Sequence, residues 1–126
     1  MSARILVVDD DENICRVVQR MLSAAGYDVD VANNGQEALS KLTPDVNLVL
    51  SDVLMPEMDG IEMIMRLRKE APSAKIISMS GGGIQDKEHV LEIAHRLGAE
   101  RTLSKPFSRE DLIATVQEVL GEVPAD

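Results

Sequence analysis

Acidic residues and one lysine follow short apolar runs of this chain. Asp9 and Asp10 come directly after one such run, and Asp52 comes after another. Lys105 follows a third, shorter run and stands before Pro106. Three carboxylates and an ammonium group, if they are gathered at one place, suit a hard divalent cation and a phosphoryl group.

The apolar runs indicate how these charged residues could meet. A strand of a parallel sheet is covered by helices on both faces, so it reads as a short unbroken apolar segment, as 5–8 and 48–50 do. The carboxyl ends of such strands lie at one edge of the sheet, and ligands bind there in open α/β folds. The sequence therefore predicts that the four charged residues share one edge.

Five strands and five helices are predicted to alternate along the chain. The strands are expected at 4–8, 29–31, 48–51, 75–79 and 101–104. The first helix has an apolar stripe that is expected to be buried, made of Ile14, Val17, Val18, Met21 and Leu22. Strict alternation predicts an α/β fold, with a five-stranded parallel sheet doubly wound by five helices.

Polar residues at the predicted helix ends support this alternation. Asp11 and Ser108 stand where an oxygen can accept hydrogen bonds from the free amides of a first helical turn. Asn34 and Glu37 have the spacing of a capping box. Gly26 follows the first helix and is expected to end it in the left-handed conformation.

Composition limits the possible functions. With 126 residues, the chain is expected to form a single domain, 1–126, with its core at about 3–120 and a polar tail at 121–126. The net charge of -9 argues against direct binding of nucleic acid, which needs a basic surface. The single cysteine permits no internal disulfide, and no apolar stretch is long enough to span a membrane. We expect a cytoplasmic protein.

In its motifs and their order, the sequence resembles the receiver domain of two-component response regulators. The resemblance covers nearly the whole chain, and it depends on Val8-Asp9-Asp10, Asp52, Met55-Pro56, Asp59-Gly60, Ser80 and Lys105-Pro106-Phe107. Each motif is weak alone, but together, at successive strand ends, they are specific. The resemblance implies the flavodoxin-like strand order 2-1-3-4-5.

A divalent cation is expected at the acidic residues. Clustered carboxylates repel one another, and a divalent cation relieves that repulsion. The resemblance implies that Asp10 and Asp52 bind Mg²⁺ or Mn²⁺ directly, together with the backbone carbonyl of Leu54. It implies that Asp9 acts mainly through water.

The resemblance also implies a reaction. The carboxylate of Asp52 would be the nucleophile and would form an aspartyl phosphate, with Lys105 and Ser80 contacting phosphoryl oxygens. The donor would be a phosphohistidine of a sensor histidine kinase or of a histidine phosphotransfer protein. The domain would catalyse only its own phosphorylation and dephosphorylation, so we do not expect an enzyme acting on an external substrate.

Signal output is expected to depend on the residues beside the site. Receivers often carry an aromatic switch residue where this chain has Thr102, so a switch through Ser80 and the glycines Gly81, Gly82 and Gly83 is expected instead. The effector protein would bind the face formed by the fourth helix, the fifth strand and the fifth helix. The resemblance also implies that the peptide bond before Pro106 is cis, which would aim the lysine at the phosphate.

Several alternatives remain open at this point. The chain could be a phosphorelay shuttle, or the N-terminal receiver of a longer regulator. A phosphatase with an aspartyl nucleophile is a remote alternative, because such enzymes carry a second aspartate where this chain has Leu54. Flavin binding is disfavoured, since Tyr27 and Phe107 are the only aromatic residues. We interpret His89 and His95 as surface residues, and Cys15 as inert packing.

Overall fold

The computed structural model describes residues 3–52, 60–80 and 99–121. Its centre is one parallel sheet of five strands in the order β2-β1-β3-β4-β5. The strands are β1 (Arg4–Val8), β2 (Asp28–Ala32), β3 (Leu48–Asp52), β4 (Lys75–Ser80) and β5 (Arg101–Ser104). This confirms the expected α/β fold and its strand order.

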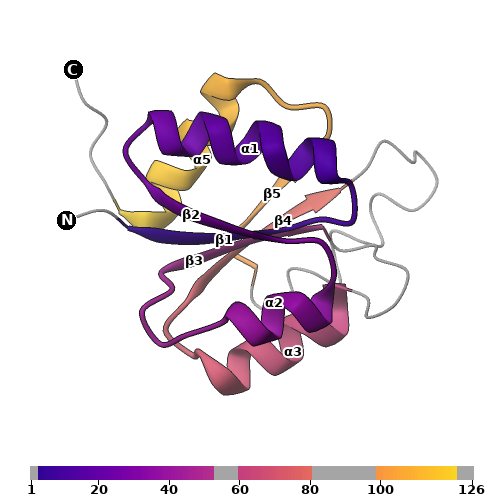
Figure 1. Ribbon diagram of the computed structural model, residues 1–126. Helices are drawn as coiled ribbons and strands as arrows, with labels where there is room; N and C mark the ends of the chain where they lie inside the picture. The colour runs from indigo at the N-terminus through magenta and orange to yellow at the C-terminus, as the bar shows by residue number, and fades with distance from the viewer. Residues whose placement is uncertain (1–2, 53–59, 81–98, 122–126) are drawn as a thin grey trace.

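Four described helices cover the two faces of the sheet. They are α1 (Glu12–Ala24), α2 (Gly35–Lys41), α3 (Gly60–Glu70) and α5 (Arg109–Leu120). Figure 1 shows α1 and α5 against one face and α2 and α3 against the other. The fourth helix of the sequence prediction falls in 81–98, outside the described residues.

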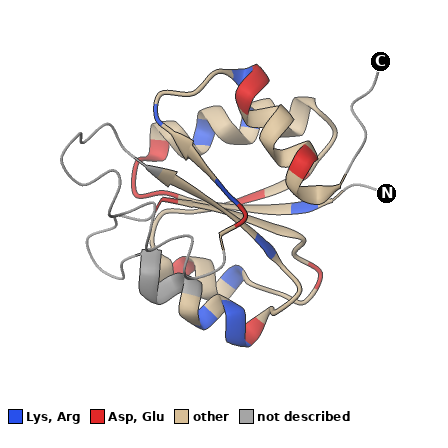
Figure 2. Cartoon of the chain, turned by 180° about the vertical axis from the view of Figure 1, so that it is seen from behind, with Lys and Arg blue, Asp and Glu red and all other residues tan. Residues whose placement is uncertain are grey.

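The two faces of the sheet bury separate hydrophobic clusters. Under α1 and α5 the cluster includes Ile5, Val7 and Leu50, and under α2 and α3 it includes Leu6 and Val49. Alternate residues of a strand point to opposite faces, so an apolar run with both faces covered buries every side chain. Figure 2 shows the consequence for charge: acidic and basic residues lie mostly on the helices and at strand ends.

The predicted helix caps are confirmed, with one shift. Asp11 accepts hydrogen bonds from the amides of Asn13 and Ile14, and Ser108 accepts one from the amide of Asp111. Gly26, just past α1, has a φ of 99°, which a side chain would disfavour.

At α2 the capping box is offset by one residue. The side chain of Asn34 accepts from the amide of Glu37 at 2.7 Å, as predicted. The carboxylate of Glu37 in turn accepts from the amide of Asn33 at 3.2 Å, instead of from the amide of the cap residue.

The buried stripe of α1 was predicted wrongly at one position. Val17 is 47% exposed, whereas Cys15 is 3% exposed and belongs to the core under α1 and α5. Five apolar residues at helical spacing span a wide arc, and the sheet covers only part of it. Cys15 lies on the side of α1 that faces the core, and Val17 lies at the exposed margin of the stripe.

Candidate functional site

The predicted carboxylates meet at the carboxyl ends of β1 and β3. One ligand-capable oxygen from each of Asp9, Asp10 and Asp52 lies within 4.8 Å of the others. Asp9 is fully buried, Asp52 is 7% exposed and Asp10 is exposed. The parallel register of β1 and β3 causes this convergence, because it pairs Val8 with Ser51. Asp9 directly follows Val8, and Asp52 directly follows Ser51, so the two carboxylates lie side by side.

Lys105 joins this cluster from the end of β5, two strands away from β3. Its Nζ atom lies 2.6 Å from Oδ2 of Asp9 and 3.2 Å from Oδ2 of Asp52. Both contacts are charge-assisted hydrogen bonds between partly or fully buried groups, and such bonds are stronger than neutral ones. The Lys105–Pro106 peptide bond is cis, in agreement with the expectation from the sequence.

Burial and charge act against each other in this cluster. Burial raises the pKa of Asp9, and the hydrogen bond from Lys105 opposes that rise without cancelling it. Burial lowers the pKa of Lys105, but its hydrogen bond to Asp9 and the charge of Asp52 together outweigh burial and leave it above the ordinary value. Lys105 is therefore an ammonium ion at neutral pH, and it already contacts two carboxylates, those of Asp9 and Asp52.

The backbone and side chain of Asp9 are held from several directions. Oδ1 accepts from the amide of Asp11 at 2.9 Å. The carbonyl oxygen of Asp9 accepts from the thiol of Cys15 at 3.3 Å and from Nδ2 of Asn33 at 3.4 Å. Both carboxylate oxygens thus have protein partners, Asp11 and Lys105.

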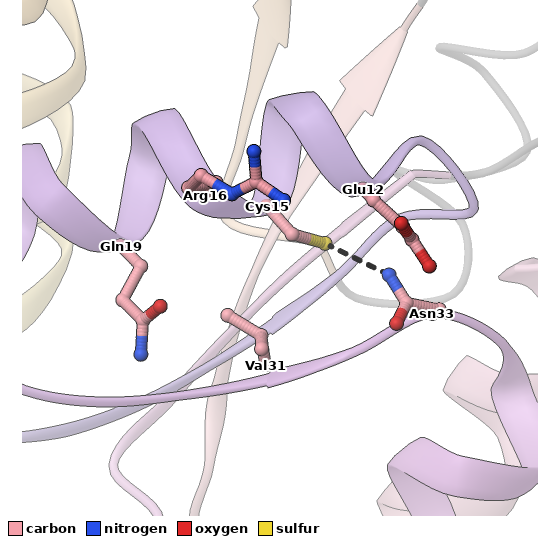
Figure 3. A pocket seen from close by; sticks show the side chains of 6 residues that line it. All are labelled: Glu12, Cys15, Arg16, Gln19, Val31 and Asn33. Carbon is pink, nitrogen blue, oxygen red and sulfur yellow. Dashed lines mark hydrogen bonds between the residues drawn. The ribbon is translucent and has the colours of Figure 1, made fainter.

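Cys15 and Asn33, which both donate to the carbonyl of Asp9, also line a small pocket. Figure 3 shows their hydrogen bond across it, which measures 3.7 Å from Nδ2 to Sγ. The pocket holds about 200 Å³ and is lined by Glu12, Cys15, Arg16, Gln19, Val31 and Asn33. Burial, with help from the negative charge of Asp9, raises the pKa of the Cys15 thiol to about 11. The thiol therefore stays protonated and unreactive, but it does more than fill space, because it donates a hydrogen bond to the carbonyl of Asp9.

The donor set fits a hard divalent cation. Carboxylate oxygens are the ligands that Mg²⁺ prefers, and it usually takes only one or two of them beside water and phosphate oxygens. Asp9, Asp10 and Asp52 each offer one carboxylate oxygen to such an ion, and these oxygens lie within 4.8 Å of one another. The Leu54 carbonyl lies outside the described residues, as do Gly81, Gly82 and Gly83.

Two predicted switch residues stand in neighbouring strands. Ser80 is the last residue of β4, and its side chain lies outside the described part of the structure. Thr102 lies in β5, where its Oγ1 atom is 3.0 Å from Oγ of Ser78 in β4. Sequence reasoning missed Ser78, and it also missed Asn33. The signal for Ser78 was a hydroxyl inside an otherwise apolar strand, where a buried polar group needs a partner.

Comparison with known proteins identifies the family. The family model of the response regulator receiver domain matches residues 5–117. The chain is 38% identical to the CpxR homologue of Haemophilus influenzae, a transcriptional regulatory protein, over 94% of this chain and 50% of that protein. It is 37% identical to PhoP of Bacillus subtilis, the alkaline phosphatase synthesis transcriptional regulatory protein, over 95% and 49%.

Solved structures agree with this assignment. A CheY-like receiver domain protein of Methanospirillum hungatei superposes with a TM-score of 0.87 at 30% identity, covering 96% of this chain and 95% of that one. Chemotaxis protein CheY4 of Vibrio cholerae gives 0.84 at 32% identity, covering 94% and 99%. The chain belongs to the response regulator receiver domain family.

Two further facts bear on its context. The chain spans about half the length of the curated relatives it matches. Across 3–52, 60–80 and 99–121, no helix has the length and apolar character needed to cross a membrane.

Proposed function

We propose that Asp52 accepts a phosphoryl group in a reaction that depends on Mg²⁺, and that the phosphorylated domain switches its binding to other proteins. One observation carries the proposal: the Nζ atom of Lys105 bridges the carboxylates of Asp9 and Asp52 while Asp10 lies beside them. Such an arrangement places a nucleophile next to a fixed cation at a partly open edge of the sheet.

The residues would act as follows. A carboxylate oxygen of Asp52 attacks the phosphorus of a phosphohistidine, the P–N bond breaks, and the imidazole leaves with the electron pair and takes a proton from solvent. Lys105 would exchange its hydrogen bond to Asp52 for one to a phosphoryl oxygen, while its hydrogen bond to Asp9 keeps the ammonium group in place. In phosphoryl transfer most of the catalysis is positioning and neutralisation of charge. Ser80, at the end of β4, is proposed to donate its hydroxyl to another phosphoryl oxygen.

Asp10 and Asp52 would hold a Mg²⁺ ion, with Asp9 reaching it through water. When bound, the ion would neutralise the carboxylates and the incoming phosphoryl oxygens. Asp9 keeps a second function in this scheme, since its contact of 2.6 Å fixes the ammonium group of Lys105. The only reaction we propose is the transfer to the domain itself and its reversal by hydrolysis.

The partners follow from the chemistry of the site. We propose a sensor histidine kinase or a histidine phosphotransfer protein as the donor, in the cytoplasm. An apolar pocket of about 100 Å³ lies beside the cluster and offers such a partner a docking surface, lined by Ile14, Val17, Val18, Met21, Lys105, Pro106 and Phe107. The named relatives are transcriptional regulatory proteins of twice this length. A receiver of a longer regulator and a relay component therefore both remain compatible with the site.

The first experiment measures phosphate incorporation by intact mass. The wild-type chain and Asp52→Asn are incubated with Mg²⁺ and acetyl phosphate, and we expect a gain of one phosphoryl group in the wild type but none in Asp52→Asn. The Asn side chain keeps the shape and removes the nucleophile. Asp28→Asn is the matched control, because Asp28 is exposed at the start of the edge strand β2. A phosphoryl group on the Asp52→Asn chain would contradict the proposal.

A further inference from the structure

Hydroxyl groups replace hydrocarbon at one level of the sheet, next to the site. Ser51 of β3 is paired with Ser78 of β4, and Ser78 is paired with Thr102 of β5. In-register neighbours project from the same face of a sheet, so these three side chains form one row. Ser51 and Ser78 are fully buried. The row stands one residue before Asp52, two before Ser80 and three before Lys105.

The three hydroxyls have two different kinds of partner. Ser51 donates to the carbonyl of the adjacent Asp52, at 2.9 Å, so its bond stays within one strand. Ser78 and Thr102 instead share a hydrogen bond of 3.0 Å that crosses from β4 to β5. A buried hydroxyl without a partner is unfavourable, so each of the two constrains the position of the other.

This hydrogen bond joins β5 to β4, its one neighbour among the described strands. β5 is the edge strand, and it pairs with β4 over only four residues, Arg101–Ser104. Among the described strands it has no second neighbour, and yet the residue that follows it, Lys105, must reach Asp9 and Asp52. A small displacement of a strand end displaces a side chain that is attached to it, and transfer reactions are sensitive to such displacements.

We propose that Ser78 and Thr102 are positioning residues for the phosphorylation of Asp52. Their shared hydrogen bond holds the end of β5 against β4, and thereby holds the ammonium group of Lys105 in contact with the two carboxylates. The inference rests on the proposed function of Asp52. It gives Thr102 a part that depends on its hydroxyl and on Ser78, at a position where receivers often carry an aromatic residue.

The test compares phosphorylation rates and amide hydrogen exchange in four variants. Ser78→Ala and Thr102→Val each remove one hydroxyl, and Thr102→Ser keeps it. We expect the first two to phosphorylate about two- to tenfold more slowly with acetyl phosphate, the range that one hydrogen bond is worth, while Thr102→Ser stays near the wild-type rate. Exchange at the amides of Thr102 to Lys105 should accelerate in the same two variants. Ile5→Val, a buried change in β1 distant from β4 and β5, controls for a general loss of stability.

The outcomes separate this inference from the function on which it rests. A wild-type chain that takes no phosphate would overturn the proposed function, while the exchange rates would still show whether the bond holds β5. If the wild type is phosphorylated, unchanged phosphorylation rates in both Ser78→Ala and Thr102→Val would overturn the inference. Slowing of Thr102→Ser or of Ile5→Val to the same degree would overturn it too, since neither change removes the hydroxyl bond.

Discussion

β5 has a paired cation at each end, and the two pairs differ in almost every physical respect. At its start, Arg101 pairs with Glu118 of α5, and the two side chains are 54% and 58% exposed. Just past its end, Lys105 pairs with Asp9, and these side chains are 17% and 0% exposed.

The two pairs differ in how far water reaches their charged groups. Water already stabilises Arg101 and Glu118 separately, so their pair adds little, although the hydrogen bond from Arg101 lowers the pKa of Glu118. Burial removes the carboxylate of Asp9 from water, and its hydrogen bond with Lys105 replaces part of the lost hydration. A buried pair of this kind is weak evidence for stability, because desolvation of both charges offsets their attraction. Its position beside Asp52 is instead the feature on which the proposed phosphoryl transfer depends.

The largest expected effect on stability is that of Lys105→Met. This change leaves the buried carboxylate of Asp9 without its ammonium partner, so we expect the free energy of unfolding without divalent cations to fall by about 2–3 kcal/mol, less than for a fully enclosed pair because solvent reaches this edge. Urea unfolding in EDTA measures it. Glu118→Gln, which removes one partner at the other end of β5, should leave the midpoint almost unchanged. Equal losses would show that burial does not distinguish the pairs.

A smaller effect is expected from Mg²⁺. A ligand that binds only the folded chain stabilises it, by about 1.4 kcal/mol at ten times its dissociation constant. The thermal midpoint of the wild type should therefore rise with Mg²⁺, and that of Asp10→Ala should not. The control Asp45→Asn changes an exposed carboxylate that pairs with Arg4, distant from the cluster, and should respond as the wild type does. A rise of the same size in Asp10→Ala would remove that residue from the site.

The smallest effect is expected at alkaline pH. The pKa of Lys105 is raised above 10.5 because its contacts with Asp9 and Asp52 outweigh burial, so the folded chain holds this proton more tightly than the unfolded chain. The resulting stability is fully present below about pH 10.5 and is lost as the pH rises through the higher folded pKa. Urea unfolding from pH 9 upward should show a steeper loss for the wild type than for Lys105→Met. Parallel curves would mean that Lys105 gains no such stabilisation in the fold.

The site illustrates which features a sequence makes visible. Asp9, Asp10, Asp52 and Lys105 could be predicted together because each follows an apolar run and parallel strands end at one edge. Their unequal burial could not be predicted, since Asp9 and Asp10 are adjacent residues of the same type. One turns inward to Lys105 and the other faces solvent, and only the path of the chain from β1 into α1 decides between them.

The fold shows a similar limit. The caps at Asp11 and Ser108 depend on neighbours within one helical turn, so a local pattern suffices to find them. The exposure of Val17 and the burial of Cys15 depend on how the whole of α1 rests on the sheet. Helical periodicity gives the direction of a stripe only to within about one residue's rotation, and packing selects the residues at its margins.

By itself, the sequence determined the alternation of strands and helices, the strand ends that carry charge, and through its motifs the family. These are properties of short segments, set by hydrophobic periodicity and by residue type. The tertiary structure alone decided that Asp9 holds Lys105, that Cys15 and Asn33 hold Asp9, and that Ser78 meets Thr102. Each of these contacts joins residues from different segments of the chain, and their partners are chosen by sheet register and helix packing, which no single segment contains.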